Sequence, residues 1–327
     1  MGLGERLGGG AGALGSAVVT PAENGQFAIM RRTSFTLAAA AAVVLSPATG
    51  AFSQAAPKHP RAGDVYEIDI VEESSSSGSD GSSSTSHDRD GFIERVVAVR
   101  ADGVELEYDV PASTEGREDV WQFPARVFRP RQGPLQLLNR AELEARVEAW
   151  LKRAKLPRAA CGHWYFSWNA FQVQCDPQSV IATLDGLDSP VPELRDGAPY
   201  RDPEAGAPAP LKRKRAGPDG GSFRAEMPLD AERVRRQRAE ADVAVGEIMH
   251  KPVTLEAALR ERAKERVSGT IAVELEADSA GNVRRRTRVV KVETRAADGR
   301  TEKQTSTQTL ERRLMEERRP AESPNRA

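Results

Sequence analysis

The chain has 327 residues, a formal net charge of −1 and 29% charged residues. This near-neutral balance excludes a general electrostatic attraction to nucleic acid, so we expect no nucleic-acid partner. Aromatic residues are only 5% of the chain and gather between Trp121 and Phe171, where we expect the best-packed core.

Residues 30–55 have the three parts of a cleavable export signal. Two arginines follow Met30, an uncharged apolar run of 11 residues begins at Phe35, and small residues precede the expected cleavage site after Ala55. The apolar run is shorter than the roughly 20 residues that a membrane-spanning helix needs. We therefore predict a periplasmic or secreted protein with no transmembrane segment after cleavage.

Cys161 and Cys175 are the only two cysteines. In an oxidising compartment, two cysteines that flank a strand-turn-strand pattern favour one disulfide, and a pair of free thiols is the alternative. Two thiols with only His163 nearby do not supply the four ligands of a zinc site. The sequence therefore predicts a Cys161–Cys175 bond.

Local patterns predict most of the elements. Alternation of apolar and polar residues predicts strands at Tyr66–Ile70, Phe92–Arg100 and Val104–Val110. The tract from Ser74 to Ser86 contains no apolar residue, so we expect a long mobile loop there. Apolar stripes of helical period predict two helices, which begin after the capping residues Asn139 and Asp176. Two further helices are expected, one from Asp230 in a highly charged stretch and one after Thr254 as its cap.

We expect an α+β fold: an antiparallel β-sheet with packed helices, then a Pro-rich linker, then a helical pair and a three-stranded β-meander. The two β regions could instead pair into one larger sheet across the linker. The expected segments are a leader or over-extended gene start at 1–29, a signal peptide at 30–55, a β-rich domain with two helices and a disulfide at 61–187, a disordered linker at 188–228, helices and the meander at 229–315, and a disordered tail at 316–327.

The stretch from Ser86 to Glu94 is similar to the core of an EF-hand calcium loop. Asp88 and Asp90 occupy alternate ligand positions before Gly91, an arrangement that converges carboxylate oxygens on a hard cation. Ser86 stands at the first ligand position, however, and Val97 stands where the bidentate Glu is needed. These departures favour an Asp-Gly turn over a calcium site, and we expect no other cofactor.

An aromatic hairpin is the main candidate for ligand binding. Such a cluster could stack on a planar ligand, whereas aromatic residues beside a disulfide more often belong to a core. If the sheet carries an apolar ligand, apolar strand residues should line its cavity. The ligand-binding candidates are Trp164, Phe166 and Trp168 of the hairpin, with Ile68 and Leu106 of the sheet.

Residues 63–187 resemble uncharacterised exported proteins of Gram-negative bacteria. The stretches that carry the resemblance are 95–100 (RVVAVR), 121–128 (WQFPARVF) and 175–181 (CDPQSVI). The resemblance implies an envelope location and a β-rich fold. In architecture alone, the expected sheet with interrupting helices is also similar to the half-barrel of periplasmic lipid carriers.

The motifs of common enzymes are missing from the sequence. The four histidines lack metal-ligand spacing, and the chain has no nucleophile elbow, phosphate loop or zinc-protease motif. We therefore expect a non-catalytic envelope protein that binds a partner protein, a lipid or another small apolar ligand. The alternative is a periplasmic hydrolase whose site is assembled from residues distant in sequence. The sequence predicts neither particular catalytic residues nor an oligomeric state.

Overall fold

The computed structural model describes residues 60–114, 116–166, 170–187, 194–217 and 220–315. The expected leader, export signal and C-terminal tail lie outside the described residues, as does Trp168 of the aromatic hairpin.

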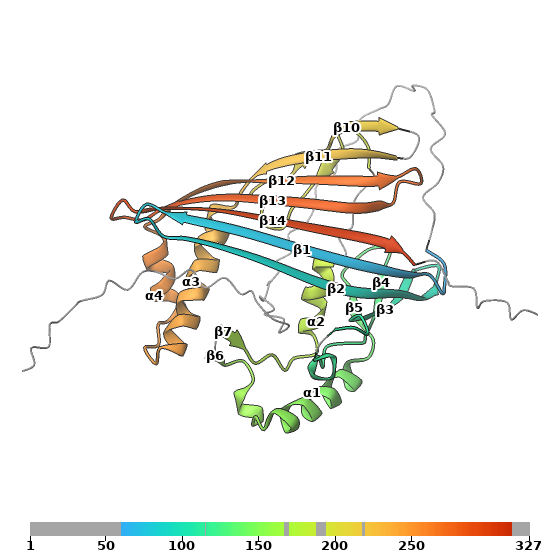
Figure 1. Ribbon diagram of the computed structural model, residues 1–327, viewed down its shortest axis with the longest axis horizontal. Coiled ribbons are helices and arrows are strands. Elements are labelled where there is room, and N and C mark those ends of the chain that lie inside the picture. The colour runs from blue at the N-terminus through green and yellow to red at the C-terminus, as the bar shows by residue number, and fades with distance from the viewer. Residues whose placement is uncertain (1–59, 115, 167–169, 188–193, 218–219, 316–327) are drawn as a thin grey trace, which may run out of the picture.

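Ten strands form one antiparallel sheet in the order β10-β11-β12-β13-β14-β1-β2-β3-β4-β5 (Figure 1). Its strands are β1 (Val65–Gly78), β2 (Ser83–Val99), β3 (Gly103–Asp109), β4 (Ala125–Pro130), β5 (Gln136–Leu137), β10 (Lys212–Gly217), β11 (Gly220–Pro228), β12 (Arg266–Asp278), β13 (Val283–Arg295) and β14 (Thr301–Leu314). Two small sheets pair β6 (Trp164–Phe166) with β7 (Ala170–Gln172), and β8 (Pro199–Tyr200) with β9 (Ala209–Pro210).

The prediction of an α+β fold is wrong, because the protein is mostly β: 46% of the described residues are in strands and 23% in helices. The expected division into two β regions also disappears. Strand β1 pairs with β14 from Tyr66–Leu314 to Gly78–Glu302, so the two regions form one sheet. Pairing removes two open sheet edges, each of which would expose unpaired backbone groups.

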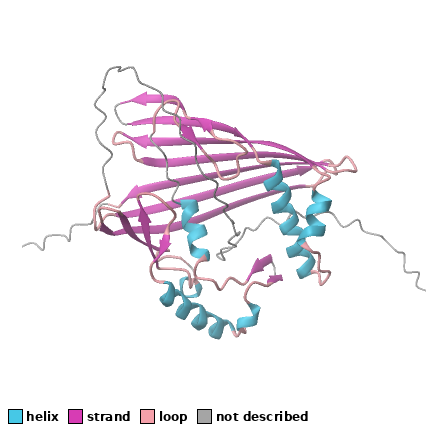
Figure 2. Ribbon diagram, turned by 180° about the vertical axis from the view of Figure 1, so that it is seen from behind, coloured by secondary structure: helices cyan, strands magenta, loops and turns pink. Residues whose placement is uncertain are grey.

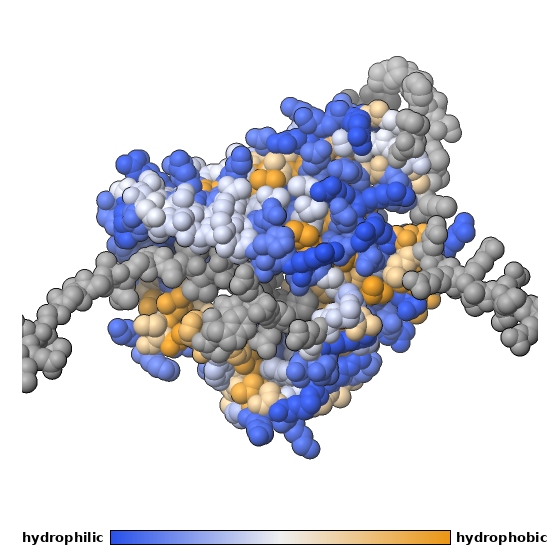
Figure 3. Space-filling view, in the orientation of Figure 1, coloured by the Kyte–Doolittle hydropathy of each residue, from blue (hydrophilic) through white to orange (hydrophobic). Residues whose placement is uncertain are grey.

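The loop expected from Ser74 to Ser86 is instead the end of a long β1–β2 hairpin. Serine hydroxyls bond across it, Ser74 to Ser86 at 2.8 Å and Ser76 to Ser84 at 2.9 Å. This end of the hairpin is pale in Figure 3, as serine-rich surface should be. Backbone ladders to β2 on one side and β14 on the other hold β1 here without any apolar burial.

The stretch expected to be a disordered linker contains strands β8 to β11. Phe223, Ala225 and Met227 of β11 alternate with polar residues and are buried, the period-2 pattern of a strand with one covered face. The basic residues from Lys212 to Arg215 lie on β10, where every side chain is exposed. Proline and glycine around these strands hid their pattern in the sequence.

Four α-helices lie on the same side of the ten-stranded sheet (Figures 1 and 2). Their bounds are α1 (Arg140–Ala154), α2 (Ser179–Leu187), α3 (Ala231–Ile248) and α4 (Leu255–Arg262). Asp230 caps α3 by accepting hydrogen bonds from two backbone amides. Among the described residues, no helix is long and apolar enough to cross a membrane.

The start of α1 differs in detail from the cap expected at Asn139. The side-chain oxygen of Asn139 accepts a hydrogen bond from the backbone amide of Arg126 at 2.9 Å, and makes no bond to an amide of its own helix. Asn139 also donates to Glu142 at 3.2 Å. Its side chain therefore ties α1 to strand β4 instead of capping the helix.

Two apolar cores lie on the face that the helices cover, which we call the inner face. The first packs Leu143 of α1 and Leu184 of α2 against Ile68, Phe92 and other residues of β1 to β4. The second gathers residues of β11, β12 and β13. Between the cores the inner face carries polar side chains, and this stretch holds the candidate site.

Candidate functional site

A row of polar side chains crosses the inner face of the sheet. Glu72 of β1 lies opposite Asp88 of β2 on one side and opposite Gln308 of β14 on the other. Gln308 pairs in turn with Arg288 of β13. Asp90 lies two residues beyond Asp88, so it projects from the same face of β2. We call Glu72, Asp88 and Asp90 the acidic inner surface.

The carboxyl groups of this surface repel one another. Glu72 and Asp90 are exposed to solvent and Asp88 is half-buried. Partial burial against the surrounding protein raises the pKa of both Glu72 and Asp90, and the charge of Asp88 raises each pKa further. The hydroxyl of Ser306, 3.4 Å from Glu72, opposes the shift. A bound cation or hydrogen-bond donor would reduce the repulsion between these carboxyl groups.

Other carboxylates already engage the guanidinium of Arg288. It donates to Asp202 at 2.8 and 3.0 Å and to Glu204 at 2.6 Å. Burial lowers the pKa of Arg288, but these two carboxylates outweigh burial and the net pKa is raised. Arg288 therefore stays charged and pins the segment before β9 to the inner face.

The neighbouring Arg286 is also held. Its guanidinium donates to the carbonyl of Gly186 in α2 at 2.8 Å and to Gln308 at 3.3 Å. Within the described residues, no ion pair includes Glu72 or Asp90. Their carboxyl groups can accept hydrogen bonds from ammonium or guanidinium groups, or exchange protons with a ligand.

The expected calcium-like loop takes a different form. Asp88 and Asp90 lie inside strand β2, and Gly91 continues that strand without a turn. Alternation still brings both carboxyls to one face, where Glu72 joins them. In the part of the chain that the structure describes, no group of three or more His, Cys, Asp or Glu residues could hold a metal ion.

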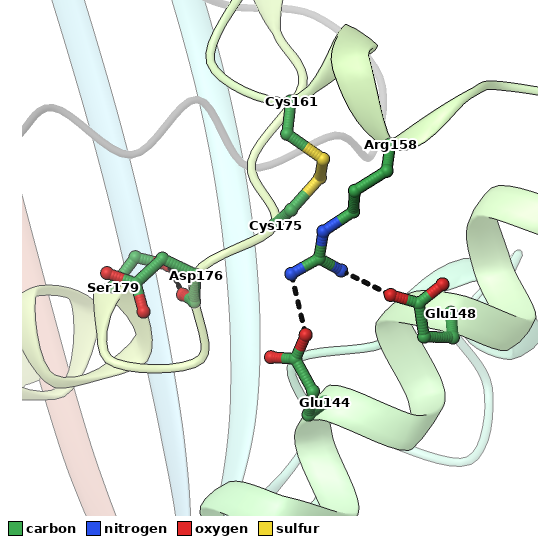
Figure 4. Close-up of a disulfide and its surroundings, with 7 residues drawn as sticks. All are labelled: Glu144, Glu148, Arg158, Cys161, Cys175, Asp176 and Ser179. Carbon is green, nitrogen blue, oxygen red and sulfur yellow. Dashed lines mark hydrogen bonds and ion pairs between the residues drawn. A yellow bond between two sulfur atoms is a disulfide. The ribbon is translucent and has the colours of Figure 1, made fainter.

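Cys161 and Cys175 form a disulfide, with the two sulfur atoms 2.08 Å apart. Figure 4 shows Arg158 beside this disulfide, where it donates to Glu144 and Glu148 of α1 at 2.6 and 2.7 Å. The disulfide closes the base of the β6–β7 hairpin, and the ion pairs join that base to α1.

The aromatic hairpin contacts α3 and exposes two rings. The ring nitrogen Nδ1 of His163 lies 2.7 Å from Glu247, which also accepts a 3.3 Å hydrogen bond from the backbone amide of Trp164. Phe166 is 65% exposed, so its ring does not belong to a packed core. Tyr165 is 39% exposed and stacks on Phe171.

The apolar ligand-binding candidates of the sheet lie elsewhere. Ile68 and Leu106 are each 1% exposed and pack inside the first core. The structure therefore brings neither of them to a surface shared with Trp164 or Phe166. The accessible middle of the inner face is polar.

Sequence reasoning found two members of the acidic inner surface and missed Glu72. Glu72 follows Ile68 and Ile70 at every second position, so the alternation of the strand predicts that it lies on the same face as they do. Its approach to Asp88 depends on strand register, and no local pattern states that register.

No family model matches the chain, and no curated protein matches it. One similar solved structure is a bifunctional dehydratase-cyclase domain in ambruticin biosynthesis, 13% identical over 76% of each chain with a TM-score of 0.12. Another is a conserved protein of unknown function with a hot dog fold from Alicyclobacillus acidocaldarius. It is 13% identical over 78% of this chain and 81% of that chain, with a TM-score of 0.10. These scores are too low to assign a fold or an activity.

Proposed function

We propose that the protein is an exported, non-catalytic envelope protein, and that its acidic inner surface binds a partner or ligand carrying positive charge. The observation that supports this most is the exposure of Glu72 and Asp90 on a face that helices and cores otherwise cover. Burial and a neighbouring like charge raise the pKa of these two carboxyl groups. A cation that approaches them stabilises their ionised form.

A polar occupant suits this surface better than an apolar one. Hydroxyl groups border the carboxyls, since Ser74, Ser86 and Ser306 follow along the same face of β1, β2 and β14. Ammonium and guanidinium groups would find both carboxylate and hydroxyl acceptors there. The expected lipid or other apolar ligand would instead leave these polar groups without partners, at a cost of about 1–3 kcal/mol for each buried group.

Location in the periplasm or outside the cell is part of the same proposal. It rests on the export signal expected at residues 30–55, and a disulfide between Cys161 and Cys175 is compatible with an oxidising compartment. Fractionation followed by intact-mass measurement tests it directly. Mature protein that begins at Ala56 supports export, and cytosolic protein that retains Met30 contradicts it.

The alternative is a hydrolase that uses Glu72 and Asp90 as proton donor and acceptor. The raised pKa of each group favours this reading, because acid–base catalysis needs carboxyls that titrate close to the working pH. Turnover of chromogenic ester or glycoside substrates that Glu72→Gln abolishes would support it. The matched control is Glu67→Gln on the outer face of the same strand.

Native mass spectrometry of the protein purified from its own compartment tests the binding proposal. We expect a co-purified polyamine, amino-sugar compound or basic polypeptide that dissociates as salt is raised. A co-purified phospholipid or fatty acid that survives high salt would contradict the proposal and favour an apolar carrier.

A further inference from the structure

A hollow of about 310 Å³ lies at one end of the sheet, between the ends of β10 and β12 and the starts of β11 and β13. Figure 1 shows these strand ends at the right of the sheet. Three glycines, Gly217, Gly220 and Gly221, contribute no side chains to it. At Gly220, where φ is +129°, an added Cβ would approach the carbonyl oxygen of Ala277 to 1.9 Å. Backbone therefore forms part of the wall, and charged side chains complete the lining.

Two of the charged side chains satisfy each other. Arg284 lies 3.5 Å from Asp278, whose carboxylate also accepts backbone hydrogen bonds from Ala280 and Asn282 at 2.9 Å each. The carboxylate of Asp278 therefore bonds within its own turn, and the guanidinium of Arg284 pairs with Asp278. This pair adds no net charge to the hollow.

The other two charged side chains have no partner in the part of the chain that the structure describes. The side chains of Arg215 and Glu276 make neither a hydrogen bond nor an ion pair with any residue that the structure describes. Arg285, which lies opposite Glu276 on β13, turns instead to Glu311 at 3.6 Å. Ser222 pairs with Arg215 on β10 and with Glu276 on β12, so one strand separates the two charges on the same face of the sheet.

We propose that this hollow binds a small zwitterion, of amino acid or dipeptide size, with its carboxylate at Arg215 and its ammonium group at Glu276. The backbones that carry the two side chains are about 10 Å apart across three strands, a gap that a small ligand and two long side chains fill. A guanidinium and a carboxylate in one hollow select opposite charges in one ligand. A volume near 300 Å³ is at the small end of ligand sites.

The charge balance gives the site its selectivity. A ligand with only a negative charge is attracted by Arg215 and repelled by Glu276. A ligand with only a positive charge is attracted by Glu276 and repelled by Arg215. This site is independent of the acidic inner surface, which lies on the opposite face near the middle of the sheet.

A titration of the full mature protein with small probes tests the proposal. The measured quantity is the shift of the backbone amide resonances of Gly217, Gly220 and Gly221 in nuclear magnetic resonance spectra. The probes are glycine, diglycine and triglycine, compared with acetate and methylamine, which each carry one charge. We expect at least one of the three zwitterions to bind about tenfold more tightly than either singly charged probe.

Matched variants identify the groups involved. Arg215→Gln and Glu276→Gln should each weaken zwitterion binding by about tenfold. Arg224→Gln should leave it unchanged, because Arg224 lies on β11 outside the hollow and faces Glu226 at 3.4 Å. Equal binding of acetate and the zwitterions, or no shift with any probe, would overturn the proposal.

Discussion

Ile70 of β1 lies directly opposite Leu310 of β14, so the first strand of the sheet in the sequence pairs with the last. Leu310 is 7% exposed and belongs to the first core, with residues of β1 to β4 and of the helices α1 and α2. The two halves of the chain therefore share both a strand pair and an apolar core, and should unfold together.

Leu310→Ala should lower the free energy of unfolding by about 2–4 kcal/mol, because it leaves a cavity in the shared core. Urea denaturation measures the change. Thr309→Ala, one residue earlier on the outer face, is the control and should cost less than about 1 kcal/mol. Equal losses for the two variants would contradict the shared core.

Reduction of the Cys161–Cys175 disulfide should destabilise the protein by about 3 kcal/mol, the contribution of closing a loop of this length. Thermal unfolding with and without dithiothreitol measures it. Cys161→Ser combined with Cys175→Ser should reproduce the lower melting temperature and lose its sensitivity to the reductant. A melting temperature that neither treatment changes would show that the hairpin is held by other contacts.

Glu94 is 2% exposed and accepts a 2.9 Å hydrogen bond from the hydroxyl of Tyr108, with Arg312 as its ion-pair partner. Glu94→Ala should cost about 3–5 kcal/mol, because it removes the carboxylate that Arg312 faces. The control Glu73→Ala, at an exposed position of the outer face, should change stability by less than about 0.5 kcal/mol. Glu94→Gln should cost less than Glu94→Ala if hydrogen bonding matters there.

The acidic inner surface should make stability depend on pH. A carboxyl whose pKa is higher in the folded state binds its proton more tightly there, so its contribution is lost as pH rises from the unfolded-state pKa through the folded-state pKa. Glu72→Gln and Asp90→Asn should each raise stability at neutral pH by less than about 1 kcal/mol, because both side chains are exposed. At a pH below about 4 the variants should match the wild type. Lower stability of the variants at neutral pH would contradict the raised pKa values.

The helices could be predicted from the sequence because their signals are local. Thr254 caps α4 as expected, and Asp230, the first residue of the other expected helix, caps α3. Each signal lies within a few residues of the element that it starts. The helix starts therefore need no knowledge of the rest of the chain.

The single sheet could not be predicted in this way. Several alternating segments could each have paired with β1, and nothing near Ile70 identifies Leu310 as its partner. The serine tract after Ile70 has no apolar residue, so its strand exists only because β2 and β14 supply backbone partners on both sides. The acidic inner surface is a consequence of that same pairing.

The most direct test of the central claim is the affinity of a fluorescent oligolysine peptide, measured by anisotropy at about 0.01 M salt, where charges are weakly screened. The variant Glu72→Gln/Asp88→Asn/Asp90→Asn removes the acidic inner surface. The control Glu67→Gln/Asp69→Asn/Glu73→Gln makes the same change in net charge on the outer face of β1. We predict that the inner-face variant binds about tenfold more weakly than the wild type and that the control stays within about twofold. Equal weakening by the two triple variants would show that the attraction is general, and would contradict a binding site on the inner face.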